Sequence, residues 1–278
     1  MPLEIAGLKV ERVTPRAPAR ANPILFLHGM WGGSWMWDHY LGFFAGRGYT
    51  GYALNLRGHH GSKPVDDIGR VRFADYLADA RAAAAAIGNP IIVGHSMGGL
   101  LAQKLAELGE PPAVVALTPA APRGIFPLCT VELFRVSLVH FHEFVLGRPI
   151  VPTPAEADAL LLGRIPPDER RAAFERLVPE SGRMAFDVAV RGVPVDAARV
   201  RCPMLVVAAR EDRITPAKMV GKIAGKYQAE LRVYDGHAFI NGISQQTAVV
   251  GKPGWNNKSS GGSGPNGPTL QTLKWYEQ

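Results

Sequence analysis

Short, continuous apolar runs recur along the first 120 residues of the chain. Four of them predict strands buried on both faces, because such strands lack a regular polar alternation. They lie at residues 24–27, 51–56, 90–93 and 113–118. Residues 3–13 alternate only loosely and run into a Pro/Ala/Arg stretch, which is typical of an edge strand and its turn.

Amphipathic stretches separate these runs and predict helices. Residues 73–87 are rich in alanine, contain no internal Gly or Pro and are followed by Gly88, so the pattern favours a helix over that range. A second helix is expected at 100–108. Alternating strands and helices predict an α/β fold, with a mostly parallel sheet and helices on both faces.

The alternation stops near residue 123. Beyond it the sequence predicts helices only, at 130–146, 154–162, 167–177 and 182–190, before strands return at 204–209 and 231–234. We interpret residues 123–195 as a helical cap inserted between two parts of one core, residues 1–122 and 196–278. Such an insertion is expected to cover the carboxyl edge of the sheet, where open α/β sheets bind ligands. An irregular loop is expected at about 242–268, followed by a short closing helix at 269–277.

Composition narrows the class of protein. A chain of 278 residues with 47% hydrophobic residues can bury the core of one large domain. The formal net charge of +7 comes from scattered basic residues without a dense block, which argues against a nucleic-acid partner. No apolar run is long enough for a membrane span, and no secretory signal is visible. The two distant cysteines, Cys129 and Cys202, are expected to be free, which favours the cytoplasm.

The strongest chemical signal is Gly94-x-Ser96-x-Gly98, between a predicted strand and a predicted helix. Serine on such a sharp turn adopts strained backbone, and the glycines remove Cβ atoms that would clash. The turn exposes the hydroxyl above the sheet. It also places the amide of Met97 at a helix N-terminus, where it can donate to an oxyanion.

From residue 24 to about 237 the sequence resembles the α/β-hydrolase family. The stretch His28-Gly29-Met30-Trp31-Gly32-Gly33 matches that family's oxyanion loop, which implies that the Met30 N–H is the second oxyanion donor and that His28 is structural. The stretch at 57–62, with His59 and His60, resembles a structural turn of the family.

A serine nucleophile needs a base, and the base needs an orienting carboxylate. Asp212 lies in a loop that resembles the family's acid loop, with Glu211 as its rival, and His237 follows the last predicted strand. The order Ser96, Asp212, His237 is the family's order. The sequence departs from the family after His237, where an irregular stretch replaces the usual helix.

Aromatic and aliphatic residues near the oxyanion loop and in the cap favour an apolar acyl substrate. The candidate substrate-binding residues are Trp31, Phe126, Leu133 and Phe134. The predicted function is hydrolysis of a small-molecule carboxylic ester through an acyl-enzyme, with no metal and no organic cofactor, in a protein that could form a homodimer.

Several alternatives stay open. They include an acyl-homoserine lactone hydrolase or other lactonase, a short-chain lipase, a perhydrolase or non-haem haloperoxidase, and a carbon–carbon hydrolase. The Trp-rich loop after His28-Gly29 also resembles that of plant methylesterases and hydroxynitrile lyases. The lyases carry a lysine where this chain has Ala238, which argues against a lyase. A non-catalytic ligand receptor of the same fold could also keep the three residues.

Overall fold

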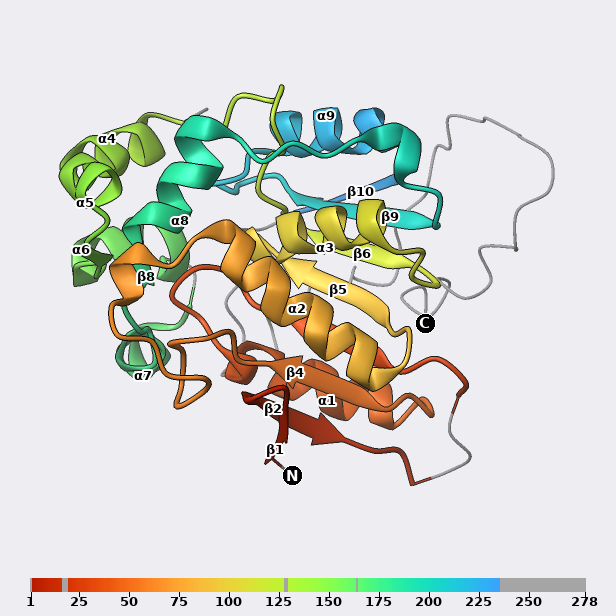
Figure 1. Cartoon of the computed structure of the whole chain (residues 1–278). Helices are drawn as coiled ribbons and strands as arrows, with labels where there is room; N and C mark the ends of the chain where they lie inside the picture. Colours follow the sequence, from red (N-terminus) through yellow and green to blue (C-terminus); the bar gives the residue numbers. More distant parts are fainter. Residues whose placement is uncertain (1, 17–19, 128–129, 164, 236–278) are drawn as a thin grey trace.

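A computed structural model describes residues 2–16, 20–127, 130–163 and 165–235 of the chain. Its centre is an eight-stranded sheet in the order β1-β2-β4-β3-β5-β6-β9-β10 (Figure 1). The strands are β1 (Pro2–Ile5), β2 (Leu8–Val13), β3 (Ile24–Leu27), β4 (Gly51–Leu54), β5 (Ile91–His95), β6 (Val114–Leu117), β9 (Met204–Ala209) and β10 (Glu230–Tyr234).

The sheet is mostly parallel. Strands β1 and β2 form an antiparallel hairpin, and β2 is also antiparallel to β4. All other neighbouring strands run parallel, so their carboxyl ends meet at one edge. The predicted fold class is confirmed. The single edge strand expected over residues 3–13 is instead this hairpin, which turns at Ala6 and Gly7, both with positive φ.

Helices cover both faces of the sheet, and the strand residues alternate between them. Side chains such as Leu25 and Leu27 belong to the core cluster of α2 (Phe73–Ile87), α3 (Met97–Leu108) and part of α9 (Ala217–Tyr227). Their neighbours Ile24 and Phe26 pack on the opposite face with α1 (Asp38–Ala45). This two-sided burial explains why the strands read as continuous apolar runs.

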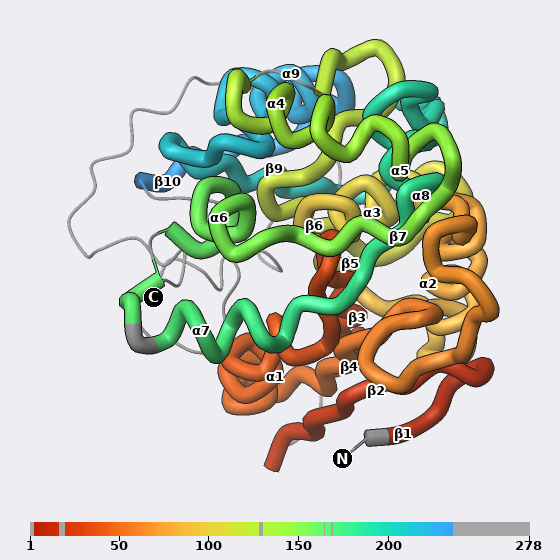
Figure 2. Tube along the Cα trace, turned by 90° about the vertical axis from the view of Figure 1, so that its left-hand side faces the viewer, coloured from red at the N-terminus to blue at the C-terminus, as the bar shows by residue number. Residues whose placement is uncertain are grey.

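Residues 130–191, which we call the helical segment, lie beside the carboxyl ends of the parallel strands (Figures 1 and 2). Its elements are α4 (Val131–Val139), α5 (Phe141–Leu146), β7 (Pro149–Ile150), α6 (Pro154–Ala157), the π-helix η3 (Asp158–Leu162), α7 (Pro167–Glu175), β8 (Glu180–Ser181), α8 (Gly182–Phe186) and the π-helix η4 (Asp187–Arg191). The antiparallel pair β7–β8 runs through this segment as a second, small sheet.

The helical segment differs from its prediction in detail. The single helix expected over 130–146 is two helices, because the backbone leaves helical geometry at His140. The His140 Nε2 lies within hydrogen-bonding distance, 3.1 Å, of the Glu156 Oε1 in α6. The break therefore coincides with a tertiary contact that the local sequence pattern does not predict. The stretch at 154–162 is likewise an α-helical turn followed by a π-helix.

Two core helices were not predicted. Helix α1 is short and contains Gly42, and α9 contains Gly221 and Gly225, which weaken the helical signal of their sequences. Among the helices of the described residues, none combines the length and the apolar character needed to cross a bilayer. The irregular loop and closing helix expected after residue 242 lie outside the described residues.

Candidate active site

Ser96 occupies the turn between β5 and α3. Its backbone angles are φ 50° and ψ −115°, in the positive-φ region that side-chain-bearing residues rarely adopt. Such a conformation costs on the order of 1–3 kcal/mol and persists only where the surrounding structure enforces it. The turn is enforced from both sides, since the Ser96 N–H donates to Leu117 O at 3.1 Å and its carbonyl accepts from Ala120 N at 2.9 Å.

The two flanking glycines allow the chain to pass through this turn. A Cβ at Gly94 would collide with the backbone of Gly98. A Cβ at Gly98 would collide with the carbonyl oxygens of Leu27 and His28. Both glycines of the motif are therefore required by close backbone packing, and Gly98 packs α3 directly onto the end of β3.

The loop after β3 lies against the nucleophile. A Cβ added to Gly29 would lie 3.1 Å from the Ser96 Cβ, and both Met30 and Met97 line the same cavity as Ser96. Met97 is the first residue of α3, so its N–H has no partner within the helix. One predicted oxyanion donor, Met97, thus follows the serine directly, and the other, Met30, lies in the loop that packs against it.

His28 stabilises this loop as a neutral ring. The Leu56 N–H donates to its Nε2 at 3.2 Å, so its Nδ1–H donates to Gly29 O, 2.8 Å away. Burial, together with the neighbouring His59, lowers the pKa of His28 to about 3. Its place in the structure is that of the structural residue expected from the sequence.

Asp212 is buried in the loop after β9. Its Oδ1 accepts from the N–H groups of Ile214 (2.8 Å) and Thr215 (2.7 Å), and its Oδ2 accepts from the Thr215 hydroxyl at 2.8 Å. These bonds fix the orientation of the carboxylate. The neighbouring Glu211 is exposed at the surface, so the two candidate acids occupy different environments.

His237 lies outside the described residues. Strand β10 ends beside β9, with Tyr234 paired to Ala209, and the chain is described as far as Asp235. Asp235 forms an ion pair with Arg210 at 2.8 Å, in the loop that leads to Asp212. The last described residues therefore end at the sheet edge that carries Asp212.

A cavity of about 120 Å³ opens above Ser96. It is bounded by loop residues of the core on one side and by the helical segment on the other. Its apolar lining includes Met30, Met36, Leu133, Phe144, Leu161 and Met184. Among the described residues, the polar ones that line it besides Ser96 are His95, Thr118, Ser137, His140 and Thr215.

The predicted substrate-binding residues divide into two pairs. Trp31 and Leu133 line the cavity. Phe126 and Phe134 do not: they are 68% and 48% exposed at the surface. Phe134 directly follows Leu133 in α4, so the two side chains point in different directions around the helix. Sequence reasoning missed Met36 and His140, and only their proximity to the oxyanion loop and to the α4–α5 junction could have suggested them.

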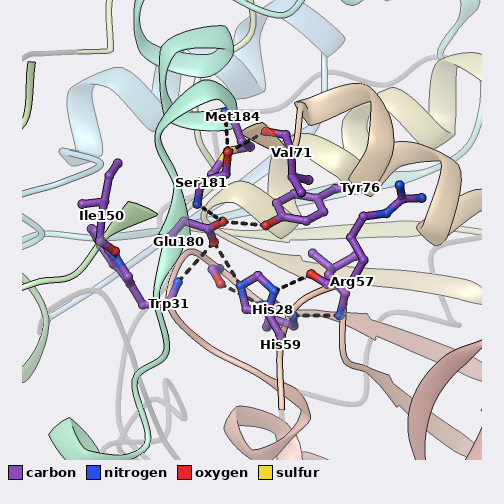
Figure 3. Close-up of polar contacts among 12 residues, drawn as sticks. His28, Trp31, Arg57, His59, Val71, Tyr76, Ile150, Glu180, Ser181 and Met184 are labelled. Carbon is purple, nitrogen blue, oxygen red and sulfur yellow. Dashed lines mark hydrogen bonds and ion pairs between the residues drawn. The ribbon is translucent and has the colours of Figure 1, made fainter. Parts of the chain in front are cut away.

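A buried ionic cluster surrounds Glu180 (Figure 3) and contacts Trp31, which lines the cavity. The Glu180 carboxylate of β8 is fully buried and bonds to the Tyr76 hydroxyl at 2.7 Å and to the His59 Nε2 at 3.3 Å. His59 also lies 2.9 Å from Arg57 O through its Nδ1, so both ring nitrogens face acceptors. Burial works to lower the pKa of His59, but the Glu180 carboxylate outweighs it and the net shift is upward.

Glu180 keeps its negative charge because His59 and nearby donors stabilise the carboxylate. Burial alone would raise the pKa of Glu180, yet the facing His59 and the donors around the carboxylate lower it overall. The pair is therefore an ion pair, with imidazolium and carboxylate neutralising each other. No sequence motif marks Glu180. Within the ranges that the structure describes, no cluster of three or more His, Cys, Asp or Glu could hold a metal ion.

Residues 24–250 match the model of a family described as the alpha/beta hydrolase family. A non-heme chloroperoxidase from Burkholderia pyrrocinia is 37% identical over 152 residues, which are 49% of this chain and 54% of that protein. The chain thus spans about half the length of this curated relative.

Solved structures resemble the fold at low sequence identity. A monoacylglycerol lipase of Paleococcus ferrophilus has a TM-score of 0.64 at 22% identity, covering 84% of this chain and 91% of the lipase. An extracellular alpha/beta-hydrolase from a Paenibacillus species has a TM-score of 0.65 at 14% identity, covering 81% and 94% of the two chains. At these low identities, the two similarities show that the fold is shared and carry no information on activity.

Proposed function

Because the chain belongs to the alpha/beta hydrolase family, we propose that it is a carboxylic ester hydrolase that acts through an acyl-enzyme on Ser96. The observation that carries this proposal is the position of Ser96, on a strained turn at the floor of a largely apolar cavity and between two backbone segments that can donate to an oxyanion. In the proposed triad His237 is the base and Asp212 is the acid that orients it.

The proposed reaction has two steps. The Ser96 Oγ attacks the ester carbonyl carbon while His237 takes the hydroxyl proton, and His237 then gives that proton to the departing alkoxide. Water next attacks the acyl-enzyme and gives a proton to His237. His237 returns that proton to the Ser96 Oγ as the bond to the acyl group breaks and the acid leaves. In both steps the N–H groups of Met30 and Met97 donate to the oxyanion, and each such donor typically contributes about a hundred- to a thousandfold in rate.

The cavity favours small or medium apolar acyl groups. Its volume of about 120 Å³ is close to that of a dry apolar cavity of about 150 Å³ that holds benzene. We infer that the helical segment acts as a cap, since Leu133 of α4 and Met184 of α8 line the same cavity as Ser96. Ser137 and His140 also line the cavity and can donate hydrogen bonds to a second ester oxygen, so lactones belong in the substrate panel.

The experiment is a rate profile for p-nitrophenyl esters from acetate to palmitate, with lactones alongside, for the wild type and Ser96→Ala. We expect kcat to be highest for short and medium acyl chains and to fall roughly a millionfold in Ser96→Ala. A folded Ser96→Ala protein that keeps a tenth of the wild-type rate would contradict the proposal. Preference for lactones over all linear esters would move the function to a lactonase with the same triad.

A second candidate, a perhydrolase, is favoured by the similarity to the Burkholderia pyrrocinia chloroperoxidase. In that reaction hydrogen peroxide attacks the same acyl-enzyme instead of water, and the product is a peracid that oxidises halide in solution. Halogenation of monochlorodimedone with peroxide, bromide and acetate measures it. A rate that depends on acetate and disappears in Ser96→Ala supports this activity, and no halogenation by an active esterase removes it.

A further inference from the structure

Trp31 occupies a backbone conformation that its side chain disfavours. It has φ 61°, and the Gly32 N–H donates to Gly29 O at 3.3 Å, which closes a tight turn with Met30 and Trp31 at its centre. Met30 is not among the residues with positive φ, so the turn has the type II pattern, which normally places glycine at the third position. The turn would otherwise relax by rotation of its central peptide, which joins Met30 to Trp31.

Three contacts from the helical segment hold Trp31 in place. Its N–H donates to the Glu180 Oε2 at 3.3 Å, its carbonyl accepts from the Val178 N–H at 3.0 Å, and its indole Nε1–H donates to Ile150 O at 3.1 Å. The Glu180 bond is the one that acts on the central peptide of the turn. Rotation of that peptide would turn the Met30 carbonyl toward the carboxylate, where the two oxygens repel each other.

The Glu180 carboxylate is itself fixed by surrounding donors. Its Oε1 accepts from the Tyr76 hydroxyl and from the Ser181 N–H, both at 2.7 Å, while His59 and Trp31 share Oε2 (Figure 3). A buried ion pair adds little net stability compared with a well-packed apolar pair of similar size. A fixed buried carboxylate instead constrains the local geometry, because it determines the orientation of the Trp31 N–H.

We propose that Glu180 is a positioning residue for the oxyanion loop. By fixing the Met30–Trp31 peptide it keeps the 29–32 turn in one conformation, and that turn presents the N–H of its second residue, Met30, to the oxyanion above Ser96. His59 keeps Glu180 ionised without leaving an unpaired charge beside the cavity. This proposal rests on the proposed function, since it needs an oxyanion to form on Ser96. It makes the helical segment a part of the catalytic geometry as well as a cover for the substrate.

The test is Glu180→Leu, which removes the acceptor at similar volume. Because Met30 would be misaimed rather than lost, we expect kcat on a good ester to fall about 10- to 100-fold while KM stays within about twofold. Affinity for a trifluoromethyl ketone, whose hemiketal oxygen occupies the oxyanion position, should fall in parallel. Affinity for the matched methyl ketone, which reports cavity binding, should stay unchanged.

Asp187→Asn is the matched control. Asp187 also joins the helical segment to α2 through a carboxylate, accepting from Arg72 at 2.6 and 2.7 Å, but it contacts no residue of the oxyanion loop. It should lose stability and keep kcat and the ketone affinity. If Glu180→Leu does not fold, Glu180→Gln, which keeps only one acceptor oxygen, should show a smaller parallel fall in both quantities.

The outcomes separate the two proposals. A folded Glu180 variant with wild-type kcat and ketone affinity overturns the positioning role, as does an equal loss of kcat in Asp187→Asn. A wild-type protein that neither hydrolyses esters nor binds the trifluoromethyl ketone defeats the proposed function instead.

Discussion

Single residues of the site are held in states that are unfavourable on their own. Ser96 has positive φ, and Asp212 keeps a carboxylate buried with three protein donors around it. Such arrangements cost stability and persist because the fold over-determines them. In the proposed mechanism the first exposes the nucleophile and the second orients the base.

Substitutions at Asp212 and Glu211 test which of the two neighbouring residues is the orienting acid. We expect Asp212→Asn to lower kcat by about a thousand- to ten-thousandfold, because the base loses its orienting charge. Glu211→Gln should change kcat by no more than about threefold, since Glu211 faces solvent. Steady-state kinetics on one ester measures both. A larger loss of kcat in Glu211→Gln than in Asp212→Asn would show that Glu211, and not Asp212, is the acid.

At the scale of elements, the site depends on how closely α3 approaches β3. The contact of Gly98 with the carbonyl oxygens of Leu27 and His28 leaves no room for a side chain. The same contact brings the oxyanion loop, which starts at His28, beside the N-terminus of α3. Helix packing and oxyanion geometry are therefore one feature of the structure.

Glycine substitutions test this packing. Gly98→Ala should lower the free energy of unfolding by about 2–3 kcal/mol, because backbone atoms on both sides must shift. Gly42→Ala in α1, where an added Cβ meets nothing within 4 Å, should raise it by up to about 1 kcal/mol. Urea unfolding of both variants measures the difference. Equal effects of the two substitutions would show that α3 does not pack as closely as described.

Elements with strong local patterns were predictable from the sequence. Strands 24–27 and 204–209 and helix 73–87 have their expected bounds, because two-sided burial and an alanine-rich run leave clear signals. The break at His140 coincides with its contact to Glu156, and the two-residue strands β7 and β8 pair across about 30 positions of the chain, so no local pattern predicts them. The role of Glu180 could not be predicted from the sequence for the same reason, since its partner Trp31 lies 149 positions away.

The whole molecule carries neutral histidines in its core, which couples its stability to pH. Burial, in each case the largest cause, lowers the pKa of His28 to about 3 and that of His95 to about 4. Below the ordinary value of 6.5 the unfolded chain takes up protons that the folded core excludes. His59 acts in the opposite sense: its raised pKa adds stability that is complete below 6.5 and is lost as the pH rises through its folded value.

Acidification should therefore destabilise the protein. From pH 6.5 down to about 4, His28 and His95 should each remove up to about 1.4 kcal/mol of unfolding free energy per pH unit. Urea midpoints at pH 7 and pH 5 measure this loss. His95→Gln cannot take up a proton and should show a shallower pH dependence. An identical slope in the variant would mean that His95 is not excluded from protonation in the folded state.

The proposed function depends on Ser96 being a nucleophile that its surroundings activate. The decisive measurement is the reaction of the full chain with a fluorophosphonate, followed by peptide mass spectrometry. We expect one adduct on the peptide that contains Ser96, formed at the rate at which esterase activity is lost and absent from Ser96→Ala. A folded protein that hydrolyses esters with Ser96 unmodified, or with the adduct on another residue, would contradict it.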